Sequence, residues 1–166
     1  MKKSTTEQVL GSIEAEASME QWERFIDFAT AHINRWIEDK SRSYNLHLAF
    51  EELLSNIIRA AGSAREAGSS PVILEISALE RADNNTCWFV LRTSDNGVHF
   101  DPQFESRSPV DTEQPVSERA IGGLGLFLIM QSVDQVNYQW KEGHNVYELS
   151  TQLAAESSQP EQGSAG

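Results

Sequence analysis

Cysteine is almost absent from this chain of 166 residues: Cys87, in the apolar run TCWFVL, is the only one. A single cysteine excludes an intrachain disulfide, so the fold depends on a buried apolar core. A chain of this length can form such a core without covalent links. We interpret Cys87 as a buried and unreactive thiol, and we expect a reducing compartment.

Long hydrophobic runs are absent too. No stretch approaches the ~18 apolar residues of a membrane-spanning helix. The N-terminal segment MKKSTTEQVLGSIEAEA has two lysines but lacks the apolar stretch of a signal peptide. We therefore expect a soluble, cytoplasmic protein with no membrane partner.

Basic residues are scarce. The chain has 13 Lys and Arg against 25 Asp and Glu, a formal net charge of −12, and its basic residues do not cluster. Proteins that bind nucleic acid neutralise the phosphate backbone with such clusters. We expect no nucleic-acid partner.

The periodicity of the apolar residues predicts five strands and three helices in one domain, residues 1–152. The expected elements are a strand at 5–17, a helix from the capping-box pair Ser18 and Gln21 to about Lys40, a helix at 45–65, strands at 72–80 and 87–94, a helix at 124–133, and strands at 135–140 and 146–153. The turn sequences RADNN and KEGHN join the last four strands into two antiparallel hairpins.

Two segments show no apolar period. Residues 103–121 are polar and contain Pro109 and Pro115, and a loop this long inside a small domain is usually functional, so we interpret it as a lid. Residues 153–166 have too few apolar side chains to offset the entropy of ordering them, and we expect a disordered tail.

Three glycines, Gly122, Gly123 and Gly125, stand where the third helix begins. A helix N-terminus presents unpaired N–H groups and the positive end of the helix dipole, and glycines let an anion approach them. The stretch therefore predicts either a phosphate cradle or a tight joint that needs small residues for packing. It matches neither a P-loop nor a dinucleotide-binding GxGxxG motif.

The sequence EELLSN places Glu52 and Asn56 four residues apart, one above the other on the second helix. An amide oxygen is a hard ligand suited to Mg²⁺, and a carboxylate beside it can accept a proton. Arg59, one turn further on, could reach a phosphate. The alternative is an ordinary solvated helix face.

The sequence SDNGVHFDP puts Asp95 and Gly97 just after a strand, either as an Asp/Gly turn or as an acceptor for a ligand amine. The four histidines show no metal-binding spacing, and we assign them no site.

In this order, EELLSN, DNGVHFDP and GGLGLFLI resemble the N, G1 and G2 boxes of the GHKL ATPase superfamily. With the ending VDQVNYQW and GHNVYELS, the chain is most similar to anti-sigma-factor serine kinases of the RsbW and SpoIIAB type, over residues 18–152. The resemblance implies the Bergerat ATP-binding fold, an α/β (α+β) two-layer sandwich in which helices cover one face of a mixed, mostly antiparallel sheet.

The resemblance also implies the ligands, ATP or ADP with Mg²⁺, and the residues that bind them. Asp95 would accept the adenine amine with Gly97 close to the base, Asn56 would help to hold Mg²⁺, and Glu52 would be the catalytic base for a serine hydroxyl. The implied nucleotide-binding set is Asn56, Arg59, Asp95, Gly97, Phe100, Gly122, Gly123, Leu124, Gly125 and Leu126. The chain departs from the family after Asn56, where it reads NIIRAAGS in place of a pattern such as NAxxHAY.

The resemblance favours a serine/threonine kinase that phosphorylates an STAS-domain anti-anti-sigma partner and sequesters a sigma factor or similar regulator, with a homodimer possible. The alternative is a nucleotide-gated binding module that switches partners without phosphoryl transfer. A third option, the catalytic domain of a histidine kinase, would follow a helix pair carrying the phosphorylated histidine; we expect no such segment here and rank this option last.

Overall fold

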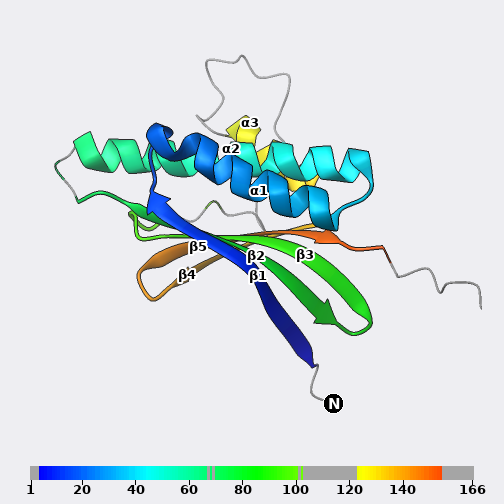
Figure 1. Ribbon diagram of the computed structural model, residues 1–166. Coiled ribbons are helices and arrows are strands. Elements are labelled where there is room, and N and C mark those ends of the chain that lie inside the picture. Colours follow the sequence, from blue (N-terminus) through cyan, green and yellow to red (C-terminus); the bar gives the residue numbers. More distant parts are fainter. Residues whose placement is uncertain (1–3, 67, 69, 101, 103–122, 155–166) are drawn as a thin grey trace, which may run out of the picture.

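The computed structural model describes residues 4–66, 68, 70–100, 102 and 123–154, in which helices lie over one face of a five-stranded sheet (Figure 1). The elements are β1 (Thr5–Glu16), the 3-10 turn η1 (Met19–Gln21), α1 (Trp22–Trp36), α2 (Lys40–Glu66), β2 (Ile73–Asp83), β3 (Thr86–Asp95), α3 (Gly123–Ser132), β4 (Gln135–Lys141) and β5 (His144–Gln152). The expected lid and residues 155–166 of the expected tail lie outside the described residues. Among the described helices, none is long and apolar enough to cross a bilayer.

The strand order in the sheet is β1-β2-β3-β5-β4. Every pair in this described sheet is antiparallel, so the two-layer sandwich is confirmed but the sheet is not mixed. The two hairpin turns have positive φ at both central residues, 46° and 68° at Asn84 and Asn85, and 51° and 79° at Glu142 and Gly143. Such turns match the twist of antiparallel strands, so the sequences RADNN and KEGHN form the hairpins they predict.

The helix boundaries differ from the predicted ones. The Ser18 side chain makes no capping hydrogen bond, and η1 precedes α1. Helix α1 ends at Trp36, short of Lys40, because Ile37 adopts an extended conformation. Helix α2 then begins five residues earlier than predicted, where Asp39 Oδ1 accepts a hydrogen bond of 2.9 Å from the Arg42 N–H. An Asp before a helix stabilises its first turn in this way.

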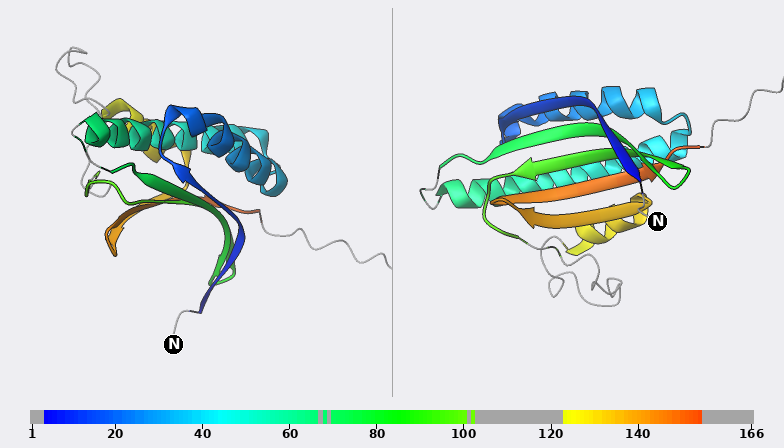
Figure 2. Two further views of the ribbon diagram at one scale, coloured as in Figure 1. Left: turned by 60° about the vertical axis from the view of Figure 1, so that its left-hand side comes forward. Right: turned by 90° about the horizontal axis from the view of Figure 1, so that it is seen from below.

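The core lies between the layers. Helix α2 buries one apolar stripe, formed by Leu46, Phe50, Leu53, Leu54, Ile57 and Ile58. The facing strands contribute Leu74, Ile76, Phe89, Leu91 and Leu149. Full burial of one such side chain stabilises the fold by roughly 1.5–3 kcal/mol. In Figure 2, α1 lies toward the β1 side of the sheet and α3 toward the β4 side, with α2 between them.

Cys87 is exposed, so its assignment as a buried thiol is wrong. It is two residues before Phe89 and therefore faces the helix side of the sheet. The end of the β2–β3 hairpin, however, curves away from the helix layer (Figures 1 and 2). Cys87 is the second residue of β3, at this end of the hairpin.

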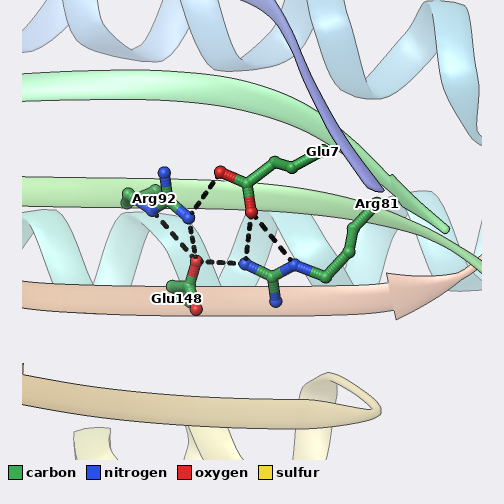
Figure 3. Close-up of polar contacts among 4 residues, drawn as sticks. All are labelled: Glu7, Arg81, Arg92 and Glu148. Atoms are coloured by element: carbon green, nitrogen blue, oxygen red, sulfur yellow. Dashed lines mark hydrogen bonds and ion pairs between the residues drawn. The ribbon is translucent and has the colours of Figure 1, made fainter. Parts of the chain in front are cut away.

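The opposite face of the sheet is concave and carries an ion-pair network (Figures 2 and 3). Glu148 Oε2 lies 2.6 Å from Arg81 Nη2 and 2.8 Å from Arg92 Nη2, and Glu7 bonds both arginines. Leu79 and Val90, paired between the two arginines, are fully buried although no helix covers this face. Burial acts to raise the pKa of Glu7, but the hydrogen bonds and charges of Arg81 and Arg92 outweigh it and lower that pKa.

Candidate nucleotide-binding site

A cavity of about 640 Å³ lies between α2 and the ends of β3 and β5. Much of its wall is apolar, and Asn56, Asp95 and Asn145 supply polar groups. The apolar lining includes Leu53, Ile57, Ala61, Val72, Leu126 and Tyr147. A concave, largely apolar pocket of 300–1,000 Å³ with a few polar groups is typical of a small-ligand site.

Asp95 is the last residue of β3 and only 5% exposed. Its Oδ1 accepts hydrogen bonds from the Gly97 N–H at 3.0 Å and from Asn145 Nδ2 at 3.1 Å. Burial raises the pKa of Asp95, while these two bonds and the charge of His144 oppose the rise. When ionised, this carboxylate is a buried acceptor suited to a ligand N–H group.

The Asp95 carboxylate lies so close to Gly97 that a side chain at position 97 would crowd it. A Cβ at position 97 would lie 2.9 Å from Asp95 Oδ1 and 3.6 Å from the Val72 side chain. The Asp/Gly turn predicted from SDNG is present and forms one wall of the cavity. The role of Asp95 as an acceptor for a ligand amine stays a prediction.

Glu52 and Asn56 meet the start of α3. A Cβ at Gly125 would lie 2.9 Å from Glu52 Oε2 and 3.8 Å from Asn56 Nδ2. Both polar side chains are half-buried, so they do not form an ordinary solvated helix face. Gly125, in the first turn of α3, lets this helix pack against the polar edge of α2.

Arg59 is exposed and lines the cavity one turn beyond Asn56. Its Nη1 lies 3.5 Å from Asn56 Oδ1, a long hydrogen bond that leaves the guanidinium free to turn toward an anion. Its position fits contact with a phosphate.

The predicted residues that line the cavity are Asn56, Arg59, Asp95, Gly97, Phe100 and Leu126. Glu52 and Gly125 face each other beside Asn56, which is one of these lining residues. Gly123 and Leu124 form the first turn of α3, and Gly122 lies outside the described residues.

Sequence analysis missed Asn145, which lines the cavity and bonds Asp95. The one feature that could have indicated its role is the register of the sheet, in which Asn145 on β5 lies directly opposite Asp95 on β3. A pattern along one strand does not reveal such a pairing.

The donor set fits Mg²⁺ brought by a ligand. Among the described residues, no three His, Cys, Asp or Glu side chains gather to form a protein-only metal site. Asn56 and Glu52 offer an amide and a carboxylate oxygen, and Mg²⁺ commonly takes one or two protein oxygens together with phosphates and water. Asn56 is the residue that would hold it.

Together, this sandwich and its cavity define a nucleotide-binding domain of the ATPase class that the sequence motifs indicate. The sequence profile of the histidine kinase-like ATPase domain matches residues 15–151, and the chain belongs to this family. The predicted superfamily is therefore confirmed.

Two curated relatives make the similarity more specific. The chain is 31% identical over 106 residues to the serine-protein kinase RsbW of Listeria monocytogenes serovar 1/2a, and equally so to that of Listeria innocua serovar 6a. In each case the match covers 61% of this chain and 61% of the relative. The resemblance to RsbW-type kinases is thus borne out over the shared region.

Proposed function

We propose that this protein is a serine/threonine kinase of the anti-sigma-factor type, which binds ATP with Mg²⁺. It transfers the γ-phosphoryl group to an STAS-domain partner and, with nucleotide bound, sequesters a sigma factor or similar regulator in the cytoplasm. The observation that carries the proposal is the approach of Glu52 to Gly125 beside Asn56. It brings the proposed base, Glu52, to the start of α3 beside the proposed metal ligand, Asn56, on the cavity wall, while Asp95 lies elsewhere on that wall.

Each residue has one task in this proposal. Asp95 accepts the amine of adenine, and the N–H groups at the start of α3 bond the phosphates. Asn56 holds Mg²⁺, which when bound neutralises phosphate charge. The oxygen of the partner's hydroxyl group forms a bond to the γ-phosphorus, and Glu52 accepts the proton of that hydroxyl. The bond between the γ-phosphorus and the oxygen that bridges it to the β-phosphate breaks, which leaves ADP. Positioning and charge neutralisation supply most of the rate in such transfers.

The names of the curated relatives support the kinase, since both are serine-protein kinases. The net charge of −12 favours a partner surface of positive charge, which an acidic protein attracts over long range.

The test compares Glu52→Gln with Glu51→Gln, the same chemical change at the exposed neighbouring residue. Loss of a positioned base typically lowers the rate ~10²–10⁴-fold, so Glu52→Gln should lose transfer to a cognate STAS protein by that factor. Glu51→Gln should transfer like wild type. Nucleotide binding should survive Glu52→Gln, whereas Asn56→Ala should weaken Mg²⁺-dependent binding.

Two results would change the proposal. If wild type transfers no phosphate to any cognate STAS protein while nucleotide still alters partner affinity, the protein is a nucleotide-gated binding module. If Glu52→Gln transfers as fast as wild type, the base lies elsewhere.

A further inference from the structure

Asn145, near the start of β5, is a buried amide that uses its full hydrogen-bonding capacity. It is 3% exposed. Its Nδ2 donates to Asp95 Oδ1 at 3.1 Å and to the Val98 carbonyl at 2.9 Å. Its Oδ1 accepts from the Phe100 N–H at 3.0 Å and from the Tyr138 hydroxyl at 2.8 Å. Two donors and two accepted bonds satisfy an amide completely.

The chemistry of its partners fixes the orientation of this amide. The Val98 carbonyl can only accept a hydrogen bond, and the Phe100 N–H can only donate one. A flipped amide would place like groups together at both positions, so one orientation serves all four contacts.

The first consequence concerns Asp95. Among the described residues, both hydrogen bonds to this carboxylate fall on Oδ1, from Gly97 and Asn145. Oδ2 is therefore the oxygen with capacity for a ligand. Because Asn145 presents a donor to Oδ1, it supports the ionised, acceptor-only state of Asp95.

The second consequence concerns the segment Gly97–Phe100, which forms one wall of the cavity. Val98 and Phe100 are 75% and 52% exposed, so burial of their side chains does not hold the segment in place. Hydrogen bonds hold it instead: Asn145 donates to the Val98 carbonyl and accepts from the Phe100 N–H, and the Gly97 N–H donates to Asp95. The Tyr147 hydroxyl adds a longer bond of 3.4 Å to the Phe100 carbonyl. The amide of Asn145 thus contacts both the recognition carboxylate and the wall beside it.

We propose that Asn145 is a positioning residue for base recognition, which holds Asp95 as an acceptor and the Gly97–Phe100 segment as a wall of the site. This inference rests on the proposed binding of an adenine nucleotide. It predicts that the preference for an amine over a carbonyl on the base depends on the amide of Asn145 as well as on Asp95.

The variant Asn145→Asp keeps the shape of the side chain and replaces the donor with an oxygen about 3 Å from Asp95 Oδ1. Two carboxyl groups this close do not both ionise, so the pair binds one proton more readily than either group alone. The proton can stand in for the N–H that faced Asp95, whereas the bond to the Val98 carbonyl stays lost. ATP affinity should therefore fall at least about tenfold at pH 8.5 and recover in part at pH 6.5, since the bond to the charged group is lost and then replaced.

The matched control is Asn137→Asp, the same change at an exposed position of β4 on the open face of the sheet. Other groups near the pair titrate or carry polar hydrogens: His144 on β5, Tyr138 on β4, and His99, whose ring stacks 6.4 Å from that of Tyr138. They are common to all variants, so the difference between each variant and wild type isolates the new carboxyl group.

Calorimetry with ATP and with inosine triphosphate, which has a carbonyl in place of the adenine amine, measures both effects. Wild type and Asn137→Asp should prefer ATP with similar pH profiles. Asn145→Asp should show the acid-restored affinity and a smaller preference for ATP. If Asn145 only stabilised the fold, the ATP affinity of Asn145→Asp would not return when the pH is lowered. Wild-type affinity and an unchanged pH profile in Asn145→Asp would overturn the inference.

Amide hydrogen exchange tests the positioning role of Asn145 without nucleotide, and so independently of the proposed function. It also provides a test if Asn145→Asp does not fold. Asn145→Thr, which is too short to keep all four bonds, should exchange the Phe100 N–H at least about tenfold faster without nucleotide. Tyr138→Phe should cause a smaller increase, because one of the four bonds is lost. If wild type binds no adenine nucleotide, the proposed function fails, and this exchange still decides the positioning role. Unchanged exchange in Asn145→Thr would overturn it.

Discussion

Replacement of Gly125 by alanine should separate stability from phosphoryl transfer. The new Cβ would lie 2.9 Å from Glu52 Oε2, whereas an ordinary contact begins near 3.4 Å. The Glu52 carboxylate can turn away at little cost because it ends a flexible side chain. A displacement on the order of 1 Å can reduce a rate ~10²-fold, so we expect transfer to fall roughly 10- to 100-fold. Alanine also favours the helix over glycine by roughly 0.5–1 kcal/mol, so the free energy of unfolding should stay the same or rise.

Gly62→Ala is the matched control, since Gly62 lies within α2 and a Cβ there would meet no atom within 4 Å. Its melting temperature should rise by up to about 2–4 °C, the shift that ~1 kcal/mol produces in a domain of this size, with unchanged transfer. The assay combines thermal unfolding, nucleotide calorimetry and labelled-phosphate transfer to a cognate STAS protein. If Gly125→Ala transfers phosphate as fast as Gly62→Ala, the placement of Glu52 as the base is wrong.

Three further predictions concern Asp95, Glu7 and the net charge. Asp95→Asn should reduce ATP affinity at least about tenfold. Burial raises the pKa of Asp95, so the ionised carboxylate lowers the stability of the fold at pH values above the pKa of the unfolded state. The uncharged amide of Asp95→Asn should therefore not lower the melting temperature at pH 7. Tight ATP binding by this variant would refute the adenine contact. Because the pKa of Glu7 is lowered in the folded state, its ion pairs stabilise the fold above about pH 4.5. This stabilisation is lost as the pH falls through the pKa of Glu7 in the folded state. Glu7→Gln should therefore cost about 1 kcal/mol in urea unfolding at pH 7 and almost nothing at pH 3, and an equal cost at both pH values would contradict the assignment. Association with a sigma-like partner should slow as salt rises, and stopped-flow rates indifferent to salt would exclude electrostatic steering.

The sequence predicted those parts of the fold that local physics determines. Alternating apolar residues gave the strands, and Asn84 with Asn85 adopts the turn that their preference for positive φ indicates. The break between α1 and α2 was predicted a few residues too late because residues 37–39 contain neither glycine nor proline. Asp39, which caps α2, was the available signal. Cys87 was misassigned because an apolar run does not reveal that its strand extends beyond the helices.

The candidate site divides in the same way. Glu52 and Asn56 could be paired from the sequence because a helix sets their spacing, and Asp95 and Gly97 because a turn does. The approach of Gly125 to Glu52 joins residues 73 positions apart, so it depends on how α3 packs against α2. Only the order of the motifs, through their resemblance to a known family, indicated that they form one site.

Asn145 shows why a positioning residue is harder to find than the residue it positions. Asp95 is recognisable because a carboxylate followed by glycine has a chemical meaning of its own. The role of Asn145 exists only through its partners, which lie at the end of β3, in the segment after it and on β4. Each bond alone is ordinary, since buried amides are normally hydrogen-bonded. What distinguishes this amide is that it bonds both Asp95, the buried carboxylate among the described lining residues, and the segment that forms the wall beside it, so its loss should alter recognition as well as stability.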